Sequence, residues 1–260
     1  MKRLIYQVYV GNRSNLYDHC TKSVKEYANT YGIDYIVQGT PKLRIKPDIF
    51  RTNRSKESYE KYGGYLPIYE KENAFDYLDE YDQIAIIDAD IYIRNTSPNI
   101  FEHFGTEYPF GGVVERDMPI TEEYTSKIAN YTRMQYGNIM LDWKWDNRGA
   151  EFFNMGMMLL NNSIKKYIKG SARQFVERAE FKDFVDGMGA WKWSTDQTLL
   201  NYWIKRYNIP SKKMSWQWNG LYKGIEDRYL SECHFVHFFL RDKLPKRGEN
   251  IQRLMQYING

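Results

Sequence analysis

The 260-residue chain has little cysteine, no long apolar run and little net charge. Its two cysteines, Cys20 and Cys233, form no CxxC or other metal-ligand spacing, which excludes a disulfide framework and a cysteine-based zinc site. No stretch approaches the roughly 20 apolar residues of a membrane-spanning helix. The apolar run near the start is also too short for a signal sequence. We therefore expect a soluble, cytoplasmic protein whose membrane contact is at most peripheral.

The charge balance argues against nucleic acid as a partner. With 37 basic and 33 acidic residues, the net charge of +4 is too small for the basic stripe expected of a DNA- or RNA-binding protein. It permits a local basic pocket for a diphosphate. The 23 tyrosines offer flat apolar faces with a hydroxyl at the tip, which suit core packing and also suit bases and sugar rings.

The first forty residues alternate strand and helix patterns. Leu4 to Val10 is an apolar-aromatic run, typical of a strand buried on both faces. Ile33 to Val37 is a second short strand. The apolar face of the helix between them consists of Leu16, Cys20, Val24 and Tyr27. This order is a βαβ unit, which predicts a parallel sheet with a right-handed crossover.

The rest of the chain continues the α/β pattern. Apolar runs predict strands at Gln83–Ile87, Phe110–Val114 and Phe152–Leu160. Apolar spacing predicts helices at Ile68–Tyr81, Phe175–Phe184 and Asp196–Tyr207. The basic segment Lys42–Arg54 has no clear period, which is typical of a solvated loop and also fits a lid. No repeat or linker interrupts the chain, so we expect one α/β domain over residues 1–260, with a mixed, mostly parallel central sheet flanked by helices.

Two acids follow the apolar strand Gln83–Ile87 directly. In an extended strand Asp88 and Asp90 would share a face, where two carboxylates repel each other and lose hydration. A divalent cation removes the conflict, because Mg²⁺ and Mn²⁺ prefer oxygen ligands and often bind one or two carboxylates together with phosphates. Open α/β sheets bind ligands at the carboxyl ends of their strands. A polar turn after a strand is the alternative interpretation of this common DxD pattern.

Four blocks of sequence, taken in order, carry a family resemblance. They are Tyr81–Asp90, Phe153–Asn161 (FNMGMMLLN), Thr195–Asn201 (TDQTLLN) and Val236–Lys243 (VHFFLRDK). They are similar to the DxD strand, the FNxGxxLxN strand, the DQxxLN element and the C-terminal HFxGxxK of one enzyme family. The chain resembles the GT-A-fold glycosyltransferases, particularly the retaining family 8 that includes glycogenin and bacterial lipopolysaccharide galactosyltransferases.

The resemblance implies a Rossmann-like GT-A fold, with a nucleotide-binding half at about residues 1–95 and a sugar- and acceptor-binding half at about residues 96–260. It implies a UDP-sugar donor and a Mn²⁺ or Mg²⁺ ion. It further implies transfer of a hexose to a saccharide or other hydroxyl acceptor, with retention at the anomeric carbon.

Matching positions assign the metal and diphosphate ligands. Asp88, Asp90 and His237 would hold the metal. His237 stands among apolar residues, where a core histidine is the other interpretation, and His234 is a competing candidate. Lys243 matches the lysine that contacts the donor diphosphate.

Further matched positions would surround the nucleotide and the donor. Val8, Val10 and Asn12 correspond to the uracil-binding edge of the family, and Ala89 lies between the two acids of the donor site. Lys71 occupies the place of a basic contact to the donor sugar, although a lone lysine on an exposed helix face is the other interpretation.

The remaining matches concern the reacting sugar. Asn154 matches a residue near the donor sugar, and Gly156 would let the backbone approach the ligand or form a strand bulge. Asp196 and Gln197 match the pair beside the reacting sugar. An N-cap on the following helix is a second role for this stretch, since Thr195 or Asp196 suits that position, and both roles can coexist.

Three departures and three rivals remain. Leu240 replaces the usual glycine of the last motif, and the proline that follows the lysine in the family is displaced to Pro245. The segment Lys42–Arg54 has no close counterpart in the family, so the acceptor specificity of the family does not transfer to this chain. The rivals are an inverting GT-A enzyme with Asp196 as its base, a nucleotidyltransferase or phosphatase that uses the same acids, and a binding protein without activity.

Overall fold

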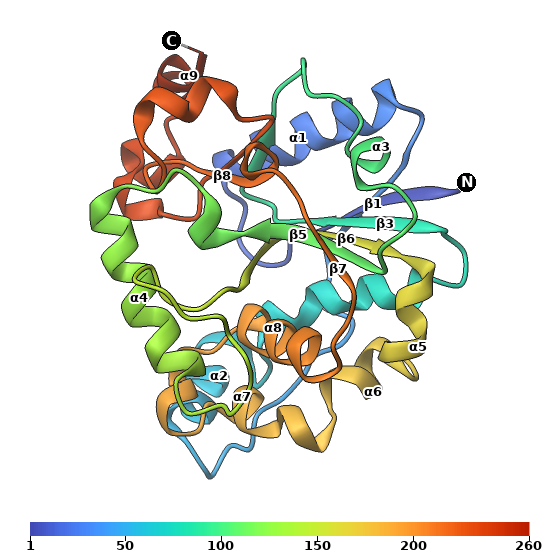
Figure 1. The fold of residues 1–260 in the computed structure, drawn as a ribbon, viewed down its shortest axis with the longest axis vertical. Coiled ribbons are helices and arrows are strands. Elements are labelled where there is room, and N and C mark those ends of the chain that lie inside the picture. The colour runs from blue at the N-terminus through green and yellow to red at the C-terminus, as the bar shows by residue number, and fades with distance from the viewer. Residues whose placement is uncertain (260) are drawn as a thin grey trace.

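A six-stranded sheet runs through the middle of the computed structural model, which describes residues 1–259 (Figure 1). Its strand order is β2-β1-β3-β6-β5-β7. Strand β1 is parallel to β2 and β3, β5 is parallel to β7, and β6 is antiparallel to both of its neighbours. The strands are Arg3–Val8 (β1), Asp34–Gln38 (β2), Gln83–Ile87 (β3), Phe110–Val114 (β5), Phe153–Asn161 (β6) and Ser211–Lys213 (β7). The expected mixed, mostly parallel sheet is confirmed.

Helices cover both faces of this sheet (Figure 1). They are Asn15–Thr30 (α1), Asn53–Tyr62 (α2), Ile100–Phe104 (α3), Glu122–Tyr136 (α4), Lys165–Ile168 (α5), Ala172–Val176 (α6), Lys182–Asp186 (α7), Asp196–Arg206 (α8) and Ile251–Asn259 (α9). One apolar core contains α1 and α3 side chains, and the other contains α6 and α8 side chains. Among residues 1–259, no helix combines the length and the apolar character needed to cross a membrane.

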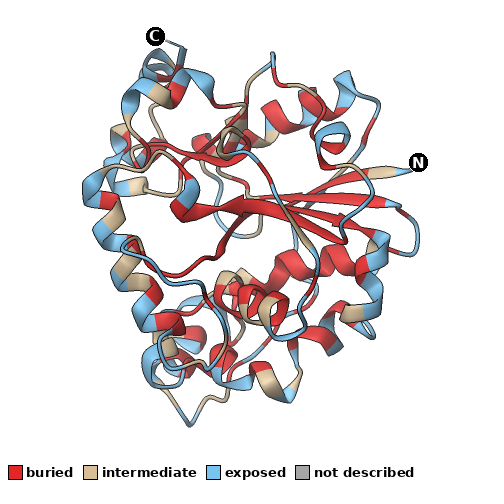
Figure 2. Cartoon of the chain, viewed as in Figure 1, coloured by how far each residue is buried: buried red, intermediate tan, exposed pale blue. Residues whose placement is uncertain are grey.

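The central strands are buried on both sides, as Figure 2 shows in red. In β3 the side chains of Ile84 and Ile86 enter one core, and those of Ala85 and Ile87 enter the other. This division follows from the two-residue period of a strand. It explains why β3 is apolar from Ile84 to Ile87 and has no polar face. Polar side chains begin again directly after the carboxyl end of the strand.

A second, smaller sheet carries the C-terminal part of the site. Its order is β4-β9-β8, with bounds Ile91–Ile93 (β4), Phe235–His237 (β9) and Gly220–Leu221 (β8). Strand β4 follows β3 after a short turn and pairs antiparallel with β9. In that register Ile91 lies opposite His237, so the pairing brings the histidine to the acids that precede β4.

Two helix predictions are wrong in detail. Residues Pro67–Tyr77 form a 3₁₀ helix rather than an amphipathic α-helix to Tyr81, and every residue from Tyr69 to Phe75 is buried. An amphipathic pattern, with one buried face and one exposed face, therefore does not describe this segment. The predicted helix Phe175–Phe184 is broken at Glu177 into α6 and α7 with a 3₁₀ turn between them.

The basic segment Lys42–Arg54 lacks regular structure up to the start of α2, but it is not a solvated loop. Leu43 and Ile45 are buried. The buried carboxylate of Glu70 accepts hydrogen bonds from the backbone amides of Lys42, Leu43 and Arg44 at 2.7, 3.0 and 2.7 Å. Three amide donors on one carboxylate hold the segment against the 3₁₀ helix.

Candidate active site

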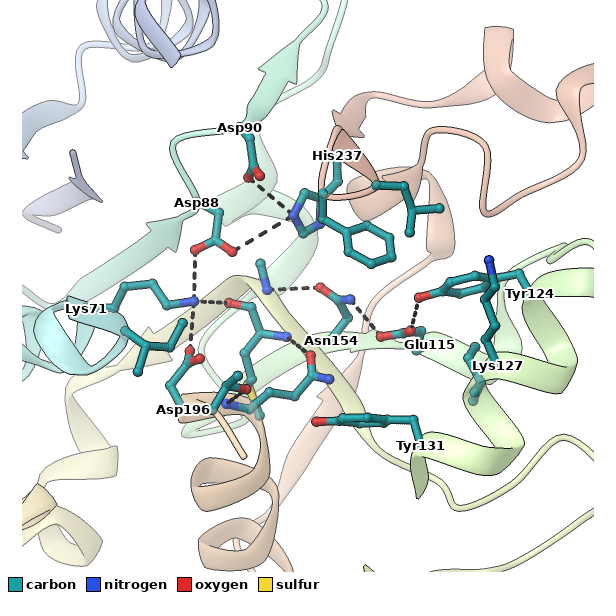
Figure 3. A pocket seen from close by; sticks show the side chains of 18 residues that line it. Lys71, Asp88, Asp90, Glu115, Tyr124, Lys127, Tyr131, Asn154, Asp196 and His237 are labelled. Carbon is teal, nitrogen blue, oxygen red and sulfur yellow. Dashed lines mark hydrogen bonds and ion pairs between the residues drawn. The ribbon is translucent and has the colours of Figure 1, made fainter. Parts of the chain in front are cut away.

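A cavity of about 420 Å³ lies beside the carboxyl end of β3 (Figure 3). Both expected halves of the chain contribute to its walls. The lining side chains that carry charge or a hydrogen-bonding group are Lys71, Asp88, Asp90, Glu115, Tyr124, Lys127, Tyr131, Asn154, Thr195, Asp196, Gln197 and His237. The cavity thus collects all three predicted metal ligands and all three residues predicted beside the reacting sugar.

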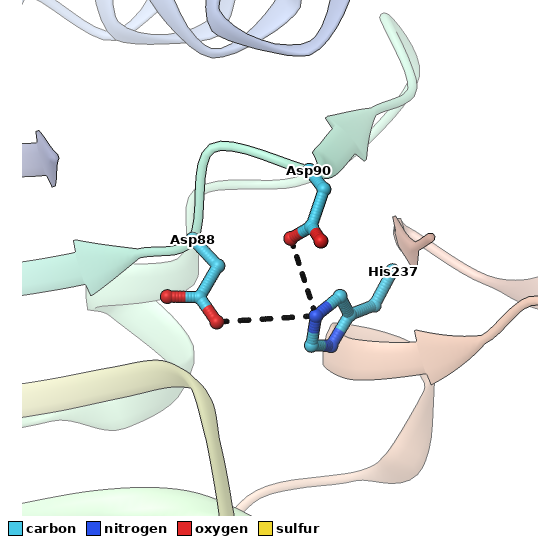
Figure 4. Close-up of side chains that lie close together, drawn as sticks. All are labelled: Asp88, Asp90 and His237. Carbon is cyan, nitrogen blue, oxygen red and sulfur yellow. Dashed lines mark ion pairs between the residues drawn. The ribbon is translucent and has the colours of Figure 1, made fainter. Parts of the chain in front are cut away.

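The ligand atoms of Asp88, Asp90 and His237 all lie within 4.8 Å of one another (Figure 4). The Nε2 atom of His237 is 3.3 Å from Oδ1 of Asp90 and 3.9 Å from Oδ2 of Asp88. The acids converge through a turn and not on one strand face, because the Ile91 amide donates to the Asp88 carbonyl at 3.1 Å between β3 and β4. Two carboxylates and one imidazole form a donor set that suits Mn²⁺.

Hydrogen bonds from β6, from a side chain of β1 and from the residue after β9 fix this turn. The Asp88 amide donates to the Gly156 carbonyl of β6 at 2.8 Å, and the Phe238 amide donates to the Asp90 carbonyl at 3.0 Å. The side chain of Gln7, in β1, donates to the Asp88 carbonyl at 3.1 Å. The positions of the two carboxylates are therefore set by the sheet itself.

The tautomer of His237 is set by Asn219. The Nδ1 atom of His237 lies 3.0 Å from Oδ1 of Asn219, and the Asn219 amide group donates to Oδ1 of Asn154 at 2.9 Å. Because the Asn219 oxygen can only accept, Nδ1 carries the proton and Nε2 faces the acids. Such an orienting partner is usual for histidine ligands of metals. His234, the competing candidate, packs against Trp218 and does not line the cavity.

Lys71 is a buried member of the site and not a lysine on an exposed helix face. Its Nζ atom is 2.8 Å from Oδ1 of Asp88, 2.7 Å from Oδ2 of Asp196 and 3.0 Å from the Met155 carbonyl. Burial alone would lower the pKa of Lys71, but Asp196 and Asp88 outweigh it, so the pKa is raised and the ammonium stays charged. The ammonium group is thus held within the protein by two ion pairs and one hydrogen bond.

Comparisons with known proteins address the fold. No protein-family model and no curated protein sequence matches the chain. A glycosyltransferase involved in glycosylation of the major capsid of PBCV-1 is similar in structure, with a TM-score of 0.55 and 12% identity over 97% of this chain and 100% of that one. An active-site mutant of LgtC gives a TM-score of 0.51 and 16% identity over 97% and 95%.

Mouse xyloside xylosyltransferase 1 is a third similar structure, with a TM-score of 0.48 and 13% identity over 94% of this chain and 100% of that one. The first two similarities extend over nearly the whole length of both chains. The chain has the GT-A glycosyltransferase fold. The narrower resemblance to family 8 stays a prediction.

Electrostatics in this GT-A cavity favour a bound cation. Burial raises the pKa of Asp88 to about 6, against the opposing effect of Lys71. Burial would also raise the pKa of Asp90, but the interaction with His237 outweighs burial, and the pKa of Asp90 is lowered. Burial would lower the pKa of His237, yet Asp90 and Asp88 raise it. The three side chains thus compete for protons in a space where a divalent ion would neutralise both acids.

The GT-A cavity also contains Glu115, which the sequence analysis missed. It is buried, and its two oxygens accept from the Tyr124 hydroxyl at 2.5 Å and the Asn154 amide group at 2.7 Å. Burial raises its pKa against these two hydrogen bonds. A signal was present, because Glu115 follows the buried strand β5 directly, as Asp88 follows β3.

Asp196 and Gln197 lie in the first turn of α8, where the N-cap is Thr195 and not Asp196. The Thr195 hydroxyl caps α8 by accepting from the Gln197 amide at 3.2 Å. The side chain of Gln197 in turn accepts from the Met155 amide at 3.1 Å, and both Asp196 and Gln197 line the cavity. The helix start therefore positions these polar groups on the cavity wall.

The other predicted contacts lie outside the lining of the cavity. Val8 ends β1, Val10 and Asn12 follow it, and Ala89 is buried in the turn between the acids. Lys243 makes an ion pair with Glu123 at 3.0 Å. Leu240, which replaces the family glycine, does line the cavity. The roles of these residues in nucleotide binding stay predictions.

Gly156 is the position where β6 passes closest to His237. The pairing of β5 with β6 is irregular between Gly112 and Val113, opposite this part of β6, as the bulge interpretation expected. A Cβ atom at Gly156 would lie 2.3 Å from Cε1 and 2.7 Å from Nδ1 of His237. Only glycine leaves the imidazole in its place.

We expect Gly156→Ala to weaken manganese binding about 10- to 100-fold, because the added methyl group must displace His237 from the acids. It should also lower the free energy of unfolding by about 1–3 kcal/mol through overpacking. Manganese titration and thermal unfolding would measure the two effects.

The matched control is Gly39→Ala, since a Cβ atom there meets nothing within 4 Å. Equal manganese affinity in the two alanine variants would show that His237 does not need its observed position.

Proposed function

We propose that the protein is a metal-dependent glycosyltransferase that moves a hexose from a UDP-sugar to a hydroxyl acceptor. The convergence of Asp88, Asp90 and His237 at the end of β3 is the observation that carries this proposal. The GT-A fold and the four sequence blocks support it. The proposed acceptor is a saccharide or another molecule with a free hydroxyl group.

The donor set fits Mn²⁺ or Mg²⁺, with the neutral Nε2 of His237 favouring Mn²⁺. When bound, such an ion supplies Lewis-acid stabilisation of the charge that grows on the leaving diphosphate. Asp88, Asp90 and His237 would hold it, and the contact of Nδ1 of His237 with Asn219 leaves Nε2 available as a ligand atom. Lys71 holds Asp88 and Asp196 together on the wall of the cavity.

The wall formed by Asn154, Asp196 and Gln197 would face the reacting sugar. As the glycosidic C–O bond breaks, the anomeric carbon becomes positively polarised, and oxygen atoms of these side chains can stabilise it. An amide such as Gln197 is a poor nucleophile, so we favour attack by the acceptor on the same face, with retention. The buried carboxylate of Glu115 holds Asn154 and the Tyr124 hydroxyl in place.

The two enzyme rivals predict different products. In an inverting enzyme a carboxylate removes the acceptor proton, and Asp196 was the candidate base. That carboxylate is paired with Lys71 at 2.7 Å, so the ammonium group already occupies one of its oxygen atoms. Analysis of the product anomer separates retention from inversion. A nucleotidyltransferase would release pyrophosphate or transfer a nucleotide, and it would not release a free sugar from a UDP-sugar.

We expect a UDP-sugar to raise the thermal midpoint only when manganese is present. A ligand at about 100 times its Kd stabilises the native state by about 2.7 kcal/mol. For a chain of this size that corresponds to a shift of about 5–10 °C. The same mixture should slowly release UDP and free sugar without an acceptor, and EDTA should stop the release.

A panel of UDP-, GDP- and ADP-sugars, each with and without manganese, would identify the donor. Hydrolysis to UMP and sugar phosphate would instead favour the phosphatase alternative. Formation of UTP and sugar phosphate when pyrophosphate is added would favour a nucleotidyltransferase. The absence of any manganese-dependent shift across the panel would contradict the proposed function.

A further inference from the structure

One exposed carboxylate joins two lysines at the rim of the cavity. Oε1 of Glu123, in the first turn of α4, lies 2.8 Å from Nζ of Lys127. Both carboxylate oxygens of Glu123 lie 3.0 Å from Nζ of Lys243. Two ammonium groups from distant parts of the chain thus converge on a single oxyanion.

Lys127 belongs to the cavity wall, next to Tyr124 and Glu115 (Figure 3). Lys71, the other lysine of the lining, is buried and already held by ion pairs to Asp88 and Asp196 and by a hydrogen bond to the Met155 carbonyl. Lys127 is paired only with an exposed carboxylate. Its partner Glu123 is an exposed neighbour one helical turn away, and pairs of this kind contribute little to stability.

Lys243 reaches the same point from the C-terminal segment. Leu240, three residues earlier, lines the cavity, so the segment passes directly over the cavity rim. The segment is also tied down beyond Lys243, because the Glu249 carboxylate accepts from the Ser14 hydroxyl at 2.7 Å and the Asn15 amide at 2.9 Å. The lysine is therefore held close to α4 by anchors on both sides of it.

We propose that Lys127 and Lys243 form a two-lysine clamp for the diphosphate of the donor, and that Glu123 occupies the clamp until the donor replaces it. The inference rests on the proposed function and adds Lys127 and Glu123 to the donor site. A phosphate presents the same kind of anionic oxygens as the carboxylate, with more charge and more acceptors, so it competes well for two ammonium donors.

The test is a titration of the full-length chain with UDP in the presence of manganese. Lys127→Gln and Lys243→Gln should each raise the Kd about 10-fold, since each removes a charge-assisted contact. Glu123→Gln should lower the Kd about 2- to 5-fold, because the competing carboxylate is lost. In the triple variant with all three changes, the gain from Glu123→Gln should disappear.

Matched controls separate the clamp from general electrostatics. Glu122→Gln removes the same charge from the same helical turn, and Arg133→Gln removes a positive charge from α4. Neither side chain has an ion pair within residues 1–259. Both controls should bind UDP as the wild type does. Uridine, which has no phosphate, should bind all variants equally.

The outcomes separate the two proposals. If the wild-type chain binds no UDP with manganese, the proposed function fails and the clamp fails with it. If the wild type binds UDP while Lys127→Gln and Glu123→Gln leave the Kd unchanged, the clamp alone is overturned. An equal effect of Glu122→Gln and Glu123→Gln would also overturn it. Thermal unfolding without ligand confirms that each variant is folded.

Discussion

Asp90→Asn should lower manganese-dependent sugar transfer about 100-fold or more, an effect as large as the loss of one transition-state contact in other enzymes. The amide keeps the shape of the side chain but removes the charge that pairs with His237 at 3.3 Å and would bind the ion. Because the backbone of the turn is held by hydrogen bonds with β6, with a side chain of β1 and with the residue after β9, the free energy of unfolding should change by no more than about 1 kcal/mol.

Donor hydrolysis at saturating manganese measures the first effect, and chemical unfolding measures the second. Asp183→Asn is the control, since it makes the same change at an exposed position of α7. Normal turnover in Asp90→Asn would remove this carboxylate from the mechanism. A large loss of stability would instead show that Asp90 is chiefly structural.

Lys71→Met should have the largest effect on stability. It leaves the carboxylates of Asp88 and Asp196 without the cation that separates them, and Asp196 is almost fully buried. Removing one partner from a buried ion pair costs about 3–5 kcal/mol. Manganese should restore part of this loss, because it can neutralise Asp88, whereas Asp196 stays unpaired.

Lys61→Met is the matched control, since Lys61 also pairs with a carboxylate at 2.7 Å but on the exposed face of α2. Its loss should leave the free energy of unfolding close to that of the wild type, because exposed ion pairs contribute little to stability. Urea unfolding of both variants, with and without manganese, gives the comparison. Similar costs for the two lysines would mean that the buried triad contributes no more than a surface pair.

The candidate metal ligands could be picked out because their signal is local. Asp88 and Asp90 follow an apolar strand that is buried on both faces, and His237 ends another short buried strand. The positions of β1, β2, β3, β5 and β6 were also predictable to within about two residues, since continuous apolar runs mark strands buried on both faces. The short strands β7, β8 and β9 were not predicted. The family blocks then indicated which histidine belongs with the acids.

Other parts of the site depend on tertiary contacts that no local pattern encodes. The 3₁₀ helix around Lys71 is buried on all sides, so its sequence shows no amphipathic period, and only the fold reveals that the lysine faces two acids. The contact between Lys243 and Glu123 joins residues 120 positions apart. Glu115 carried the same strand-end signal as Asp88, but a single acid there does not indicate a cation on its own.

The hydrogen bonds that hold the Asp88–Asp90 turn have a consequence for its dynamics. Since the Asp88 amide is bonded to the Gly156 carbonyl across β3 and β6, the turn cannot open without parting the central strands. Amide hydrogen exchange at Asp88 should then report the global opening reaction and be as slow as exchange in the middle of β3. The backbone of the turn that carries both carboxylates is thus ordered when the chain folds, so an ion that bound there would not have to order it.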